Sequence, residues 1–190
     1  MGRKAGIALE DVVATAARIA DRDGLEAATL TAVAGELGIK TPSLYNHVDG
    51  LPGLRRLLAI LGARILLEEF KAAAQGLDGT EALRAIASAD RQFAIEHPGL
   101  YESFLPAPTE EEDPELYSEM AAPAFLVAHY FLDMGIPQGE AIHLVRALRA
   151  LLHGFLDLEA KQGFGMPVDI QASFNASVEL ILAGVKAAAD

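Results

Sequence analysis

Residues 29–48 have the sequence TLTAVAGELGIKTPSLYNHV, and this stretch has the spacing of a helix-turn-helix. A helix-turn-helix that reads DNA needs a supporting helix, a tight turn and a second helix whose exposed side chains reach the major groove. Thr29 is a typical N-cap, and Gly38 can adopt the positive φ that the turn requires. Thr41 and Pro42 suit a second helix start, because proline at the first helical position loses no hydrogen bond. The segment therefore predicts a helix after Thr29, a turn at Gly38 and a short helix from Thr41.

The side chains of this segment separate into an apolar set and a polar set. The apolar set is expected to anchor the two helices, with the small Ala34 at their crossing, and consists of Val33, Leu37, Ile39, Leu44 and Val48. The polar set is expected to face outward and consists of Lys40, Thr41, Ser43, Tyr45, Asn46 and His47. Every member of the polar set can hydrogen-bond to phosphates or base edges, and none is acidic. The spacing favours a DNA-reading pair of helices, although a helix pair inside a bundle would follow the same spacing.

Charge is distributed unevenly along the chain. With 15 Lys and Arg against 27 Asp and Glu, the net charge is −12, which as a whole opposes nucleic-acid binding. Residues 1–60 are balanced, however, because they contain seven basic and seven acidic side chains. A DNA-contacting surface is therefore expected at the N-terminal end. There, Arg3 and Lys4 suit either a DNA-contacting arm or a disordered start, and Arg55 and Arg56 suit either DNA contacts or a solvated helix surface.

The remaining sequence predicts an all-α fold. Apolar residues recur at helical spacing and strand-like alternation is almost absent. About nine helices are expected, over residues of about 8–23, 30–37, 41–47, 51–74, 80–96, 100–105, 114–134, 137–162 and 169–188. Pro123 is expected to kink or split the seventh of these helices. We expect a helix-turn-helix DNA-binding domain over residues 1–50 and a second helical domain over residues 51–190.

Several classes of protein are disfavoured by the composition. The chain has no Cys, no apparent signal peptide and no apolar stretch long enough for a membrane span, so a cytoplasmic location is expected. Its five His residues are scattered, without the spacing of a metal pair, and no phosphate-binding loop or nucleophile elbow is present. We therefore expect no catalytic residue, metal site or cofactor. An all-helical enzyme using His and carboxylates, and a helical interaction module, stand as the alternatives.

The helix-turn-helix segment ends in Leu44-Tyr45-Asn46-His47-Val48, and with this ending it resembles the DNA-binding domain of TetR-family regulators. The resemblance covers about residues 8–60. More faintly, residues 96–101 (EHPGLY) and 152–155 (LHGF) resemble the WHG-type regulatory domain of some members, although this chain contains no Trp.

The resemblance implies a homodimeric repressor that binds a palindromic operator and is released by a small-molecule effector. The residues that it implies for DNA binding are Thr29, Thr31, Lys40, Thr41, Pro42, Ser43, Tyr45, Asn46 and His47. This chain departs from the family at Leu51, where many members have a phosphate-binding Lys, and at Thr31, where Arg is frequent. Each departure removes a charged contact, so a shallow salt dependence is expected unless other cations compensate.

The resemblance also implies that residues 51–190 form the domain that binds the effector and the second subunit. Aromatic, Met and His side chains that cluster in sequence are expected to line a pocket for a largely apolar effector, although such residues commonly form core: Phe93, His97, Tyr101, Phe104, Met120, Phe125, His129, Tyr130 and His153. His143, Arg146, Arg149, His153 and Asp157 share one side of a helix, which suits a solvated face, a buried polar network or an effector cavity.

The last two predicted helices carry the expected dimer interface. It combines small residues on one helix with an apolar stripe on the other, although such stripes also form intramolecular core: Ala147, Ala150, Gly154, Phe174, Val178, Ile181 and Val185.

Overall fold

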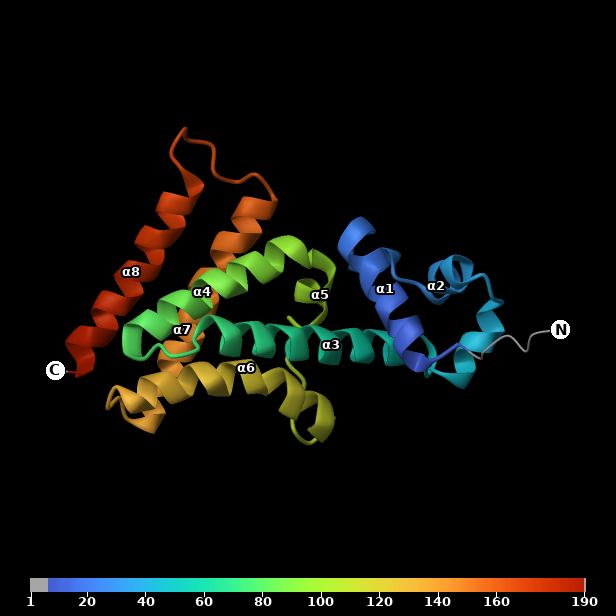
Figure 1. Ribbon diagram of the computed structural model, residues 1–190, viewed down its shortest axis with the longest axis horizontal. Coiled ribbons are helices and arrows are strands. Elements are labelled where there is room, and N and C mark those ends of the chain that lie inside the picture. The colour runs from blue at the N-terminus through green and yellow to red at the C-terminus, as the bar shows by residue number, and fades with distance from the viewer. Residues whose placement is uncertain (1–6, 190) are drawn as a thin grey trace. The chain divides into compact units, whose positions relative to one another are not determined.

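A computed structural model describes the backbone of residues 7–189 and the side chains of residues 7–185, and this part of the chain is helical throughout, without strands (Figure 1). It contains eight α-helices and two 3-10 helices. Their bounds are α1 Leu9–Asp23, η1 Leu25–Ala27, α2 Leu30–Leu37, η2 Thr41–Asn46, α3 Gly50–Ala73, α4 Gly79–Glu96, α5 Pro98–Ser103, α6 Pro114–Asp133, α7 Gln138–Ala160 and α8 Ile170–Ala189. The predicted all-α class is confirmed.

Three details of the helix pattern differ from expectation. The sequence did not predict η1, and the segment after Thr41 forms a 3-10 helix in place of an α-helix. Helix α6 continues through Pro123 without splitting. Pro123, Val127 and Phe131 lie at helical spacing and all three are buried, so burial of this stripe offsets the hydrogen bond that proline removes.

The two ends of α2 follow the caps predicted from the sequence, whereas η2 begins at Thr41 with Lys40 as its N-cap, so the prediction of Thr41 as that cap is wrong. The Thr29 hydroxyl accepts a hydrogen bond from the Ala32 backbone N–H at 3.2 Å, which satisfies one of the free donors at the start of α2. Gly38 has a φ of +67°, the left-handed conformation that glycine adopts without strain, and ends α2 there. Both caps are therefore confirmed.

The chain divides into two compact units. One contains residues 1–65 and 95–120, and the other contains residues 66–94 and 121–190. This division differs from the expected boundary at residue 50 because α5, although distant in sequence, packs against α1. Whether the functional domains meet at residue 50 stays a prediction.

In the first unit, two glycines let α5 approach its neighbours. A Cβ on Gly99 would lie 2.2 Å from the carbonyl carbon of Ala20 in α1, so only glycine allows this backbone contact. A Cβ on Gly62 would lie 2.9 Å from the Phe104 ring, next to the end of α5. Helix α5 is thus held against α1, which supports the helix-turn-helix, and against α3, which follows it directly.

The second unit has an aromatic and aliphatic core. Phe93 of α4, Phe131 of α6 and Phe174 of α8 are essentially inaccessible to solvent. Phe174 meets the ring of Phe155 edge to face at a centroid distance of 5.3 Å, which joins α7 to α8. Over the described residues, every helix is too short or too polar to cross a lipid bilayer.

Candidate nucleic-acid interface

The short helix η2 is fixed from behind by apolar residues. Leu44 is completely buried and Val48 nearly so, and they lie in the same unit as the buried Val33 and Ala34 of α2. Leu37 and Ile39 are half-buried. The Ile39 backbone N–H donates to the Ala34 carbonyl at 3.0 Å, which closes the turn between the two helices. The predicted anchoring set is therefore confirmed for Val33, Leu44 and Val48, while Leu37 and Ile39 are only half-buried.

The opposite side of η2 is polar and accessible to solvent. Of the residues predicted to bind DNA, Thr31, Lys40, Pro42, Ser43, Tyr45 and Asn46 are exposed, and Thr29, Thr41 and His47 are half-buried. The Tyr45 side chain stands out, because 62% of this large residue is exposed. Within the described part of the chain, the Ser43, Tyr45 and Asn46 side chains make no hydrogen bond, so their donors and acceptors are available to a partner.

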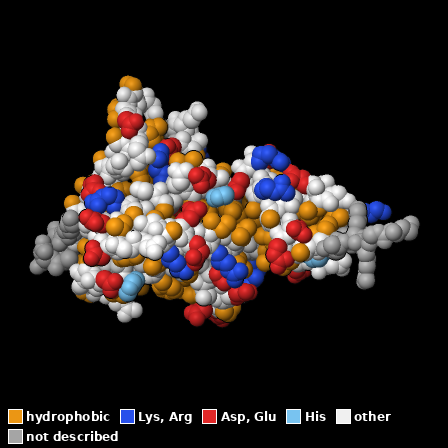
Figure 2. All heavy atoms as spheres, in the orientation of Figure 1, with side chains coloured by type: hydrophobic (Ala, Val, Ile, Leu, Met, Phe, Trp, Pro, Cys, Tyr) orange, Lys and Arg blue, Asp and Glu red, His pale blue; other side chains and the backbone are white. Residues whose placement is uncertain are grey.

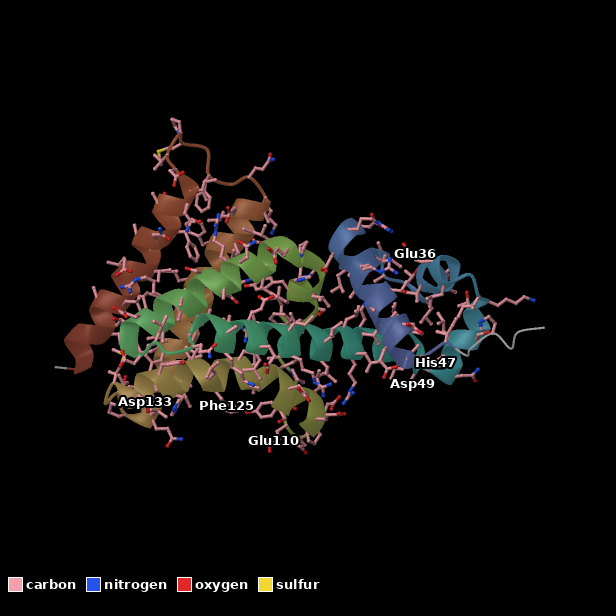
Figure 3. The ribbon with its side chains drawn as sticks, viewed as in Figure 1. Glu36, His47, Asp49, Glu110, Phe125 and Asp133 are labelled. Carbon is pink, nitrogen blue, oxygen red and sulfur yellow. The ribbon has the colours of Figure 1, made fainter. Side chains whose placement is uncertain are left out.

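The acid on α2 lies away from this polar surface. The Glu36 carboxylate contacts Arg22 at 2.9 Å and Arg18 at 3.4 Å, both on α1. Figure 3 shows Glu36 apart from His47 and Asp49, which lie near one another where η2 turns into α3. The hydrogen bonds that Arg22 donates to Asp23 and Glu36 raise its pKa above the usual value. Glu36 thus pairs α2 with α1, and η2 itself contains no acid, while the exposed Asp49 lies beside His47 at the start of α3.

Most cations near the helix-turn-helix are already paired within the chain. Arg56 donates to Asp113 at 3.0 Å and to Glu115 at 2.6 Å, and Arg55 lies 3.2 Å from Glu26. Of the two alternatives for Arg56, the geometry favours an ion pair within the chain over a DNA contact. Figure 2 shows the same pattern on its visible face, where blue and red side chains lie next to each other.

Lys40 differs from these arginines. It is exposed on the polar side of η2, and no carboxylate of the described residues pairs with it. Arg3 and Lys4, the other cations considered for a DNA contact, lie outside the described residues. Lys40 is therefore the described cation best placed to meet a phosphate.

The residues predicted to line an effector pocket fall into both units. His97, Tyr101, Phe104 and Met120 belong to the first unit, where the Tyr101 and Phe104 rings meet edge to face at 5.5 Å. Phe93, Phe125, His129, Tyr130 and His153 belong to the second. Phe125 and His129 are exposed, and Figure 3 shows Phe125 on the outer side of α6. Phe93 is fully buried in the core, and His153 is half-buried.

The residues predicted for the dimer interface differ in whether they are exposed or buried. Ala147, Ala150 and Gly154 are exposed on α7, as an interface requires. Phe174, Val178 and Val185 are buried within the single chain, so the prediction for these three is wrong, and Ile181 is half-buried. The apolar stripe of α8 faces the core of its own unit. The exposed side of α8 carries Leu180, which is 75% exposed.

Sequence reasoning missed a polar junction in the first unit. The Asp21 carboxylate accepts a hydrogen bond from the Leu100 backbone N–H at 3.0 Å, and its other oxygen lies 2.9 Å from His97 Nδ1. The two ends of this junction are far apart in sequence, so no local pattern could reveal it.

Comparison with known proteins agrees with this architecture. Residues 83–181 match the family model described as "Tetracyclin repressor-like, C-terminal domain". The chain is 34% identical over 186 residues to the uncharacterized HTH-type transcriptional regulator YobS of Bacillus subtilis (strain 168), covering 97% of this chain and 96% of YobS. It is 37% identical over 100 residues to the HTH-type transcriptional repressor DrrR1 of Streptomyces coeruleorubidus, covering 52% of this chain and 36% of DrrR1.

A solved structure shows the same fold. A TetR variant from Acinetobacter baumannii AYE, in complex with minocycline, superposes with a TM-score of 0.73 at 19% identity and covers 96% of this chain and 98% of its own. The family match spans about half of the chain and the identity to YobS spans nearly all of it, so the resemblance seen in the helix-turn-helix segment is confirmed. The chain belongs to the TetR family and is a transcriptional regulator, not an enzyme.

Proposed function

We propose that this regulator is a repressor that binds a palindromic operator as a homodimer and is released from it by a small-molecule effector. The observation that carries the proposal is the exposed, acid-free surface of η2, anchored by Leu44 and Val48. The name of DrrR1, a transcriptional repressor, supports repression, and the minocycline complex of the A. baumannii protein supports a small-molecule effector.

The residues of the η2 surface take different parts in this proposal. Lys40 carries the positive charge that would attract phosphate, and the exposed Tyr45 could donate its hydroxyl hydrogen to the DNA backbone. Ser43 and Asn46 can exchange hydrogen bonds with base edges in the major groove. Thr29 uses its hydroxyl to cap α2 and so contributes by orienting this helix.

Dimerisation is assigned to the exposed sides of α7 and α8. The small side chains of Ala147, Ala150 and Gly154 would let another helix approach α7 closely, and Leu180 adds an exposed apolar surface on α8. A two-fold dimer would present two copies of η2 to successive major grooves, which matches a palindromic site.

The proposed effector is largely apolar and carries one or two hydrogen-bonding groups. In the first unit, Tyr101, Phe104, Met120 and His97 supply aromatic, thioether and imidazole groups of the kind that such a molecule contacts. An effector that favours one spacing of the two η2 helices would change DNA affinity about 5- to 150-fold, which corresponds to a coupling of about 1–3 kcal/mol.

The test is a footprint and gel-shift experiment with the purified protein. DNA upstream of its own reading frame and of the neighbouring frames is the probe, at about 50 mM salt, where phosphate contacts contribute most. We expect protection of a palindromic site. Tyr45→Ala should weaken this binding by at least about tenfold, whereas Tyr117→Phe, at a half-buried tyrosine of α6, should leave it unchanged.

A helical interaction module predicts a different result. In that case no fragment would show a protected palindrome, and replacing Tyr45 or His47 would leave the function of the protein intact. Protection that is equally strong for wild type and Tyr45→Ala would place the DNA contact elsewhere and contradict the assigned surface.

A further inference from the structure

Two exposed arginines on α7 stand apart from the other cations of the chain. The structure describes twelve Lys and Arg side chains, and nine of them pair with a carboxylate of the same chain. The three that do not, within the described residues, are Lys40 on η2 and Arg146 and Arg149 on α7. In a chain of net charge −12, where acids outnumber bases, these three are the minority of the described cations.

Arg149 and Arg146 have different surroundings. The charge of Arg149 acts on Asp90, a carboxylate of α4 that is only 8% exposed. Arg146 has no described carboxylate near it and lies on the exposed side of α7. Arg146 is therefore an exposed arginine that is free to meet a carboxylate of another molecule.

The exposed side of α7 is polarised along its length. Arg146 lies in its first half, the small Ala150 and Gly154 lie in the middle, and the half-exposed Asp157 lies toward the end. Because these positions recur at helical spacing, they form one face. Asp157 contacts Lys161 at 2.6 Å, but this pair is exposed and adds little stability, so Asp157 can share a second cation.

This face of α7 can pair its Arg146 with the Asp157 of a second copy only when the two α7 helices run antiparallel. A two-fold axis places the first half of one helix against the second half of the other, so Arg146 of one copy lies opposite Asp157 of the partner subunit. Two pairs of residues give positions for this axis that differ by half a residue. Pairing Ala150 with Gly154 of the partner subunit centres the axis at the level of Leu152, and pairing Arg146 with Asp157 of the partner subunit centres it between Leu151 and Leu152. The small residues and the charges thus agree on one register to within half a residue.

We propose that Arg146 forms an ion pair with Asp157 of the partner subunit, and that the two symmetric pairs fix the register of the homodimer. This inference rests on the homodimer of the proposed function and adds the residues that select its geometry. Charged pairs at an interface contribute to specificity mainly by excluding other registers, since a shifted α7 would leave Arg146 without a counter-charge.

Sedimentation of the full chain tests the proposal through the dissociation constant of the dimer. Arg146→Glu should raise this constant about 10- to 100-fold at low salt, because two attractive pairs become repulsive. The charge swap Arg146→Glu with Asp157→Arg should restore it to within about threefold of wild type. Arg64→Glu is the matched control, because Arg64 is an exposed arginine on α3 that pairs with Glu119. Circular dichroism of each variant establishes that its helices are intact.

The outcomes separate the two proposals. A wild-type chain that sediments as a monomer contradicts the proposed homodimer. A wild-type dimer that Arg146→Glu weakens no more than Arg64→Glu, or a charge swap that stays as weak as the single variant, overturns the pairing of Arg146 with Asp157 and leaves the homodimer standing.

Discussion

Asp21 of α1 caps the N-terminus of α5 by accepting a hydrogen bond from the Leu100 backbone N–H at 3.0 Å. Leu100 is the third residue of α5, the position whose N–H is satisfied by the capping side chain in most helices. Here the cap comes from another helix, and the same carboxylate lies 2.9 Å from His97 Nδ1. Asp21 therefore joins the helix that supports η2 to the segment matched by the regulatory domain of the family.

Replacing Asp21 by Ala should lower the free energy of unfolding by about 1–2 kcal/mol, because the cap is removed and Leu100 N–H stays poorly solvated. Urea denaturation measures this change. Glu10→Ala, at an exposed acid in the first turn of the same helix, should change stability by less than about 0.5 kcal/mol. Equal effects of the two variants would show that the cap contributes nothing beyond surface charge.

Gly99→Ala should lower the stability of the protein more than removal of the Asp21 cap does. The added methyl would lie 2.2 Å from the carbonyl carbon and 2.3 Å from the carbonyl oxygen of Ala20, and backbone atoms cannot rotate away. We expect a decrease in stability of about 3 kcal/mol or more, seen as a lower melting temperature. Gly139→Ala, which meets no atom within 4 Å on α7, should be neutral or stabilise the protein by up to about 1 kcal/mol. A harmless Gly99→Ala would mean that α1 and α5 do not approach each other in this way.

Asp90 should make stability depend on pH. Burial raises its pKa to about 7, and Arg149 partly opposes this rise. The folded state therefore holds a proton that the unfolded state releases above its pKa of 3.8, and Asp90 lowers the stability of the fold as the pH rises from about 4 to 7. Asp90→Asn stays neutral, so its advantage over wild type should be larger at pH 8 than at pH 5, by on the order of 2–3 kcal/mol.

Urea unfolding at these two pH values checks the prediction for Asp90. Asp78→Asn, at an exposed acid just before α4 with no ion pair among the described residues, is the control and should show little pH-dependent difference. An advantage of Asp90→Asn that is the same at pH 5 and pH 8 would contradict a raised pKa.

The sequence predicts local features of this protein well and distant ones poorly. The caps at Thr29 and Gly38 and the anchoring of Leu44 follow from residues within a few positions of each other, and the structure confirms them. The junction of Asp21 with Leu100 depends on α1 and α5 meeting in space, which periodicity does not encode. The stripe of Phe174 and Val178 illustrates a related limit, because an apolar face predicts burial without indicating whether the same chain or a partner buries it.

Cations also form ion pairs that the sequence does not predict, because these pairs depend on contacts between distant residues. Their positions in the sequence allow both Arg56 and Lys40 to meet phosphate, and only the three-dimensional contacts distinguish Arg56, which Asp113 and Glu115 hold, from Lys40. The hydrogen bond from Arg56 also lowers the pKa of its partner Asp113 to about 2.

This difference leads to a prediction about salt dependence. If Lys40 meets one phosphate in each half-site, Lys40→Gln should reduce the slope of log K against log salt concentration by about 0.9 for each phosphate that is no longer neutralised, or about 1.8 per dimer. Affinity should fall by a similar factor on every DNA sequence, because phosphate contacts carry no sequence information. Lys71→Gln is the control, since Lys71 is exposed but pairs with Glu68 far along α3. Filter binding between about 50 and 200 mM salt gives both slopes. An unchanged slope for Lys40→Gln would remove Lys40 from the interface, and a decrease in affinity confined to one operator sequence would assign it to a base.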